Sequence, residues 1–198
     1  MTQVLAINGS YRHDGVIDHL VGLLATELVE RGADVEIILL REYPIEFCLN
    51  CRECSQQPGA APAQCARLDE MAELVGMIER ADAFILASPT NFGSATALFK
   101  RFMERLAVYG YWPWGQVAPV YRKQGHAKKK AIVVSSCAAP GILGRWLFAT
   151  TRQLKTTAKV IGAETVGVIV AGLAATEPRP VLSSGLAVKA RKLAARVA

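Results

Sequence analysis

The feature that most constrains this chain is the alternation of two hydrophobic patterns along its length. Short apolar runs of four to six residues are separated by longer stretches in which apolar residues recur every three or four positions. The runs predict strands at residues 4–7, 35–40, 83–87, 131–134 and 166–171, and the first of them is expected to be buried on both faces. Because parallel strands need crossover connections of this length, the pattern predicts an α/β protein with a five-stranded parallel sheet and helices on both faces.

Two of the helices between these strands carry specific expectations. The first is predicted to use Asp14 as its N-cap and to stop at Arg31 and Gly32. A later stretch predicts one continuous helix closed by Gly162, with helical spacing kept by Leu143, Leu147, Leu154, Ala158 and Ile161.

The composition favours a single domain over residues 1–198, since 52% of the residues are apolar and only 20% are charged. Residues 47–65, rich in Cys, Gln and Pro, and residues 109–130, rich in aromatic residues and then in Lys, break the alternation and are interpreted as insertions. No apolar stretch approaches the roughly 20 residues that cross a bilayer, and the first residues lack a signal-peptide pattern. We therefore expect a cytoplasmic protein with no membrane association.

The charge of the chain is unevenly distributed. Residues 1–99 contain 6 Lys and Arg against 14 Asp and Glu, whereas residues 100–198 contain 17 against 3. A basic half attracts anionic ligands, so a phosphorylated cofactor, an acidic redox partner and nucleic acid are all to be considered. Solvated helix faces are the alternative interpretation. Because no nucleic-acid-binding module is recognisable, nucleic acid is not an expected partner.

The loop after the first strand, Gly9-Ser10-Tyr11-Arg12-His13-Asp14-Gly15, leads into a helix. Backbone N–H groups and the helix dipole favour an anion at such a position. Ser10 adds a hydroxyl, and Arg12 adds a guanidinium that suits phosphate oxygens. The loop is neither a dinucleotide fingerprint nor a Walker A loop, so it predicts a site for a single phosphate, with an ordinary connecting loop as the alternative.

Two further loops follow predicted strands. Ser88-Pro89-Thr90-Asn91-Phe92-Gly93-Ser94 follows the third strand; Pro89 fixes its turn, Gly93 permits an unusual backbone angle, and Asn91 can donate to and accept from a heterocycle. Phe92 could alternatively belong to the core. Ser135-Ser136-Cys137-Ala138-Ala139-Pro140-Gly141 follows the fourth strand, and its small side chains leave room for a ring whose carbonyl edge could bond Ser135 and Ser136. Ligands in open α/β sheets bind beyond the carboxyl ends of strands, where these loops are expected.

These motifs resemble a known family. NGSYR after the first strand, the cysteine segment, SPTNFGS and ALFKRFMERL, which together span about residues 1–106, are similar to the NADPH-dependent FMN reductase family of the flavodoxin-like fold, especially its cysteine-bearing iron-sulfur flavoproteins. The resemblance implies a three-layer sandwich that binds FMN and uses NAD(P)H. It implies contacts to the FMN phosphate from Ser10, Arg12 and the backbone of Gly15, Val16 and Ile17, and contacts to the ring and ribityl chain from Pro89 to Gly93, with Ala138 in the third loop.

The chain departs from the family pattern at the phosphate loop. Many relatives have Asn or Ser followed by Thr where this chain has Val16 and Ile17. Two side-chain donors are therefore absent, and backbone N–H groups must carry more of the phosphate binding.

Four cysteines form a motif of their own. Cys48, Cys51 and Cys54 have C-x2-C-x2-C spacing, and Cys65 follows after ten residues. Four thiolates could hold a 4Fe-4S cluster or a zinc ion, and four reduced cysteines without metal remain the third interpretation. The five cysteines of the chain fit a reducing compartment better than a set of disulfides.

The aromatic and basic segment begins Tyr109-Gly110-Tyr111-Trp112-Pro113-Trp114 and continues through several lysines. It predicts an interface patch, which makes a homo-oligomer plausible, or a lid near the flavin whose basic residues reach the phosphates of NADPH. His126 is expected to be a solvated surface residue.

The leading hypothesis is an FMN-dependent NAD(P)H oxidoreductase that passes electrons to free flavin, a quinone or another small acceptor. Because the cofactor supplies the chemistry, no catalytic side chain is predicted. The alternative is an electron-transfer protein, with FMN and a cluster, that acts between protein partners. A third hypothesis is a regulatory or scaffold protein that has lost FMN.

Overall fold

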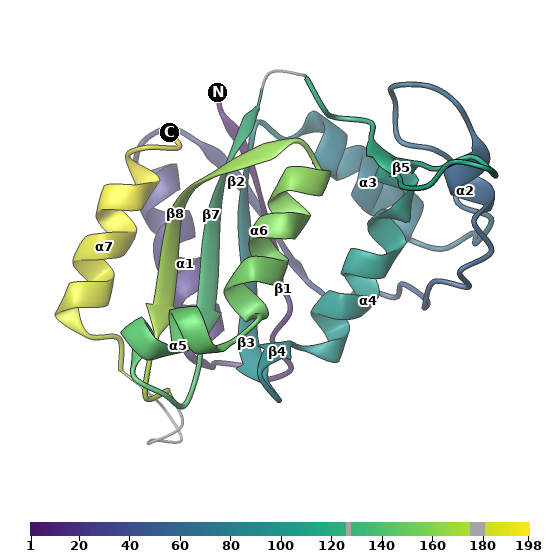
Figure 1. Ribbon diagram of the computed structural model, residues 1–198. Helices are drawn as coiled ribbons and strands as arrows, with labels where there is room; N and C mark the ends of the chain where they lie inside the picture. Colours follow the sequence, from purple (N-terminus) through teal and green to yellow (C-terminus); the bar gives the residue numbers. More distant parts are fainter. Residues whose placement is uncertain (126–127, 175–180) are drawn as a thin grey trace.

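The computed structural model describes residues 1–125, 128–174 and 181–198, so His126 lies outside the described residues. Its central sheet has the order β2-β1-β3-β7-β8, and each neighbouring pair is parallel (Figure 1). These strands are β1 (Gln3–Asn8), β2 (Asp34–Leu39), β3 (Ala83–Asn91), β7 (Lys129–Ser136) and β8 (Ala163–Ala171). A short β4 (Ser94–Ala95) pairs antiparallel with the end of β3. The predicted flavodoxin-like α/β fold, with its five parallel strands, is confirmed.

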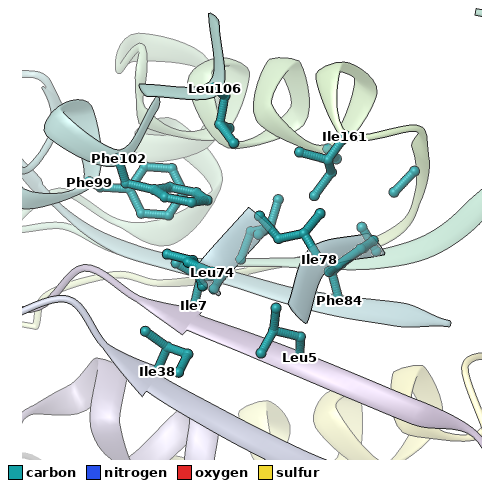
Figure 2. Close-up of a cluster of buried hydrophobic side chains, with 14 of the residues drawn as sticks. Leu5, Ile7, Ile38, Leu74, Ile78, Phe84, Phe99, Phe102, Leu106 and Ile161 are labelled. Atoms are coloured by element: carbon teal, nitrogen blue, oxygen red, sulfur yellow. The ribbon is translucent and has the colours of Figure 1, made fainter. Parts of the chain in front are cut away.

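Helices cover both faces of the sheet. One face carries α1 (Val16–Val29) and α7 (Ser184–Ala194), and the other carries α3 (Met71–Arg80), α4 (Ala97–Arg105) and α6 (Thr150–Val160) (Figure 1). Side chains of a strand alternate between the faces, so Val4 and Ala6 pack toward α1 while Leu5 and Ile7 pack toward the opposite helices. Figure 2 shows this second cluster, in which Phe99 and Phe102 of α4 lie above the strands.

The smaller elements lie at the two ends of the sheet. They are α2 (Glu53–Gln56), the 3-10 helix η1 (Leu106–Tyr109), β5 (Gly110–Tyr111), β6 (Val120–Tyr121) and α5 (Gly141–Leu147). Among the described residues, no helix is long and apolar enough to cross a membrane.

Two helix predictions are wrong. Asp14 is not the N-cap of α1, because that position is taken by Gly15, while Asp14 adopts a positive φ of 54° and its N–H donates to Asp18 Oδ2. The single long helix is two helices, α5 and α6, separated at Phe148, which is extended. The N–H of Ala149 donates to Gly93 O, so a contact with the β3–β4 turn fixes the break. Apolar spacing continues across the break, which is why the periodicity did not reveal it.

Candidate functional site

A cavity of about 250 Å³ opens where β1, β3 and β7 end. Its walls come from the loop after β1, the end of β3 and the loop after β7, with Ala174 after β8. Parallel strands bring their carboxyl ends to one edge of the sheet, so residues far apart in sequence meet here. The three loops that the sequence singles out therefore share one cavity.

Most of the predicted cofactor residues line this cavity. They are Ser10, Arg12, Gly15, Val16, Ile17, Pro89, Thr90, Asn91, Ser136 and Ala138. Tyr11, Cys137 and Ala174 also line it, although the sequence reasoning did not select them. Tyr11 and Cys137 lie within the predicted loops, and Ala174 follows a parallel strand, so the strand-end rule could have found all three.

Three predicted residues, Phe92, Gly93 and Ser135, are not part of this lining. Phe92 and Gly93 form the tip of the turn between β3 and β4, with φ values of 48° and 74°, and the two positive angles are typical of a two-residue hairpin turn. The turn points the Phe92 side chain into solvent, so the interpretation of Phe92 as core is wrong. Ser135 is buried behind the cavity wall, with its Oγ 3.4 Å from Thr90 Oγ1.

The N-terminus of α1 forms one end of the cavity. Its N-cap, Gly15, is extended and has no side chain that could cap the helix. Val16 and Ile17, the next two residues, line the cavity. Uncapped N–H groups and the positive end of the helix dipole form a site for an anion. The residues therefore fit the phosphate of FMN, held mainly by backbone.

A network beneath this loop holds its shape. The side chain of Asn8 accepts from the N–H of Ser10 at 2.9 Å and donates to Asp18 Oδ1 at 2.6 Å. Ser10 Oγ in turn accepts from the N–H of Arg12. Because Asn8 is only 1% exposed, these bonds are shielded from water and fix the turn after β1.

Arg41, which follows β2, completes the network. Its guanidinium makes a two-point contact with Asp18, at 3.1 and 3.0 Å, and also donates to the carbonyls of Ser10 and Arg12. The two loop carbonyls therefore point toward Arg41. Arg41 also neutralises a carboxylate that would otherwise repel a phosphate. Nothing in the sequence pattern singles out Asp18 or Arg41, because the pair joins positions 23 residues apart.

Thr96, which follows β4, connects the end of β3 to the loop after β1. It is fully buried, its Oγ1 donates to Gly9 O at 2.6 Å, and it caps α4 by accepting from the N–H of Phe99. Gly9 packs so closely on Phe99 that a Cβ at Gly9 would lie 2.8 Å from the Phe99 Cβ. The loops after β1 and β3 are therefore held in a fixed relation.

Cys137 is the one thiol in this cavity. Its Sγ donates to Ala139 O, it is 5% exposed, and burial raises the pKa of its thiol. A buried, protonated thiol is a packing group rather than a nucleophile.

The three cysteines of the C-x2-C-x2-C motif and Cys65 line a different cavity, of about 330 Å³, at the other end of α4. The helix α2, which contains Cys54, lies at that end of the molecule (Figure 1). Burial raises the pKa of the Cys54 thiol, and the nearby Cys65, Cys48 and Cys51 raise it further. Two buried donors on this lining, Arg52 Nε and Arg67 Nε, have no hydrogen-bond partner among the residues that the structure describes. The donor chemistry suits an anionic sulfur cluster, but no three Cys, His, Asp or Glu residues within the described ranges are arranged to hold a metal ion. As placed, the thiols do not form a cluster site.

The cysteine segment is joined to the aromatic segment by two arginines. Arg122 is 6% exposed and donates to five backbone carbonyls, including those of Cys54 and Gln57. The guanidinium of Arg52 stacks between Trp112 and Trp114, 4.2 and 4.0 Å from the ring centroids. These contacts form a rigid unit around the larger cavity.

The two cavities are separated by the length of α4. Thr96 at its N-terminus contacts the loop after β1, whereas Arg105 at its last turn donates to Cys65 Sγ and pairs with Asp69. Nine helical residues span about 13 Å.

The expected lid is not observed, because no described residue of the aromatic and basic segment lines the smaller cavity. Three of its lysines are bonded elsewhere. Lys123 pairs with Glu79, Lys129 donates to the carbonyls of Ile78 and Glu79, and Lys130 donates to Arg196 O.

Comparison with known proteins finds relatives of similar sequence. An iron-sulfur flavoprotein of Archaeoglobus fulgidus is 32% identical over 111 residues, which cover 56% of this chain and 48% of the relative. One of Methanocaldococcus jannaschii is 30% identical over 103 residues, covering 52% of this chain and 51% of the relative. The matches thus span about half the length of these curated relatives.

The fold also matches solved structures. An FMN-dependent NADH-azoreductase of Bacillus anthracis, solved in complex with FMN, superposes with a TM-score of 0.71 over 99% of both chains at 13% identity, a likeness of fold alone. The family model described as NADPH-dependent FMN reductase matches residues 2–176. Because this model spans most of the chain, and the sheet has the flavodoxin-like strand order, the chain belongs to the NADPH-dependent FMN reductase family.

Proposed function

We propose that this chain is an FMN-dependent oxidoreductase that takes hydride from NAD(P)H and passes electrons to free flavin, a quinone or another small acceptor. One observation carries the proposal: the uncapped N-terminus of α1 and the loops after β3 and β7 line a single cavity at the carboxyl edge of the sheet. The family of the chain supports the same assignment.

In this proposal the side chains and backbone bind and orient. The N–H groups at Gly15, Val16 and Ile17 hold the phosphate, with Arg12 beside them. Pro89, Thr90 and Asn91 lie along the flavin, and Ser136 and Ala138 leave room for the ring. FMN supplies the hydride-accepting and electron-releasing chemistry when bound. No protein acid or base is required, in keeping with the buried, protonated state of Cys137.

The visible spectrum of the purified protein tests the proposal. Protein loaded with FMN should retain flavin bands after gel filtration, the bands should bleach rapidly when NADPH is added without oxygen, and they should return when a quinone or free flavin is added. Bound flavin that NADPH does not reduce would contradict the enzyme assignment. A protein that stays colourless with added FMN would instead support the regulatory or scaffold hypothesis.

A second candidate is an electron-transfer protein that carries a 4Fe-4S cluster on Cys48, Cys51, Cys54 and Cys65. It is favoured by the cavity that the four thiols share and by the two unpartnered guanidinium N–H groups in its lining. Because the thiols do not converge on a metal position, such a cluster requires the segment to rearrange. Anaerobic purification followed by iron and sulfide assays decides, since absence of both would remove this candidate.

We also propose a homo-oligomer that uses the aromatic segment. Apolar side chains are exposed there, with Trp114 at 69%, Val117 at 96% and Val120 at 47%. Analytical ultracentrifugation showing only monomer at micromolar concentration would contradict this proposal.

A further inference from the structure

A third cavity adjoins the proposed FMN site. Its volume is about 440 Å³, and it lies between α5, the end of β8 and the N-terminal half of α7 (Figure 1). Its lining includes Arg145 and Trp146 of α5, and Ser183 and Lys189 of α7.

The two cavities share a wall. The loop after β7 lines the FMN cavity through residues 136–138 and this cavity through Pro140 and Gly141, while the chain after β8 contributes Ala174 to one and Gly172 to the other. The two loops are bonded, since the N–H of Leu173 donates to Ala139 O and that of Ala174 donates to Cys137 O. A Cβ at Gly141 would lie 2.7 Å from Val170 O, so the loops pack backbone to backbone. The two cavities are therefore neighbours, divided by this packed backbone.

The charges in this cavity are unbalanced. Neither Arg145 nor Lys189 pairs with a carboxylate within residues 1–125, 128–174 and 181–198. Burial and the positive charge of Arg145 lower the pKa of the Lys189 ammonium. Ser183 is the N-cap of α7, so the positive end of that helix dipole faces the same space. An anion held between these groups would relieve the repulsion between the two cations.

Trp146 adds an aromatic ring to the lining of this cavity. The indole of Trp146 lines the cavity and is 83% exposed, which is unusual for a large apolar side chain without a partner. A flat heterocycle can stack on such a ring. The cavity therefore combines a stacking surface with cations that recognise phosphate.

Resting on the function proposed above, we propose that this cavity binds the adenosine half of the reduced dinucleotide, with Arg145 and Lys189 on its 2′-phosphate and Trp146 against the adenine. The site then selects NADPH over NADH. Three lysines of the aromatic and basic segment, Lys123, Lys129 and Lys130, are bonded elsewhere.

Adenosine 2′,5′-bisphosphate is the probe for this cavity, because it carries the adenine and the 2′-phosphate without the nicotinamide. Isothermal titration calorimetry of the FMN-loaded protein should show binding that is tighter than that of adenosine 5′-monophosphate. The double variant Arg145→Gln, Lys189→Gln should weaken binding of the bisphosphate by about 30-fold, since two charge-assisted contacts are lost. Trp146→Ala should weaken binding of both nucleotides.

The matched control is Arg152→Gln with Lys192→Gln, which removes the same charge from exposed positions of α6 and α7 outside the cavity lining. In steady-state assays, the ratio of the KM for NADPH to that for NADH should rise about 30-fold in the cavity variant and remain near the wild-type value in the control.

The inference is overturned if the bisphosphate does not bind, or if the cavity and control variants change its affinity equally. Either result would leave NADPH oxidation, and so the proposed function, intact. If the FMN-loaded protein oxidises neither dinucleotide, the proposed function fails, and the calorimetric loss in the cavity variant still decides whether the cavity recognises the nucleotide.

Discussion

The contact between Arg41 and Asp18 makes a sharp prediction about FMN affinity. Both side chains are largely buried, at 10% and 17% exposure, and Arg41 is the cation that neutralises Asp18 in the first turn of α1. Replacing Arg41 with Met keeps the aliphatic stem and removes the charge. Asp18 then lies uncompensated near the place where the phosphate binds.

The magnitude follows from Coulomb's law. At an effective dielectric constant of about 20 and a separation of about 8 Å, one uncompensated negative charge repels each unit of phosphate charge by about 2 kcal/mol. For a single unit of phosphate charge that energy corresponds to an increase of about 30-fold in the Kd, so the Kd for FMN should rise by at least about 30-fold. Riboflavin has the same ring and ribityl chain but no phosphate, so its Kd should change by less than about threefold.

The assay is quenching of flavin fluorescence during titration with the apoprotein, carried out with FMN and with riboflavin. Adding Asp18→Asn to the Arg41→Met variant should recover most of the FMN affinity, because the uncompensated charge is then gone. Arg31→Met is the matched control, since Arg31 pairs with Glu27 near the far end of the same helix. Equal losses for FMN and riboflavin, or no recovery in the double variant, would refute the electrostatic reasoning.

Three further predictions concern stability and the phosphate loop. Thr96→Val removes the cap of α4 and leaves Gly9 O without its partner, so urea denaturation should show a loss of about 3 kcal/mol, while Thr96→Ser should lose less than about 1 kcal/mol. Val16→Thr adds a hydroxyl of nearly the same shape at the phosphate site, so the Kd for FMN should fall about fivefold in the fluorescence titration. Burial alone would raise the pKa of Asp69, but hydrogen bonds from Arg105 and from backbone N–H groups outweigh it and lower that pKa. The ionised carboxylate therefore stabilises the fold at any pH above the ordinary pKa of Asp. This stability is lost as the pH falls through the lowered value. Thermal melts should therefore show the wild type losing more stability than Asp69→Asn below about pH 4, and parallel curves for the two proteins would contradict this assignment.

Several elements were accessible to sequence reasoning because they depend on local pattern. The five parallel strands were predicted from apolar runs, and the reason is plainest for the central strands β1, β3 and β7, which are covered on both faces and so hold few polar side chains. The loop positions followed from the rule that ligands gather at the carboxyl ends of strands, and the structure places Ser10, Pro89 and Ser136 on one cavity. The break at Phe148 escaped prediction because it depends on a contact with Gly93, which is 55 residues away from it.

The sequence by itself determined the order of strands and helices and the loops in which to look for a cofactor, because hydrophobic periodicity and helix-terminal anion sites are properties of short segments. Only the tertiary structure decided what surrounds those loops. Arg41 lies on the Asp18 carboxylate, the cysteines line a cavity at the far end of α4, and two cations, Arg145 and Lys189, share the cavity between α5 and α7. Such arrangements join side chains from separate elements, and their energies depend on distances and burial that exist only once the sheet and its helices have packed.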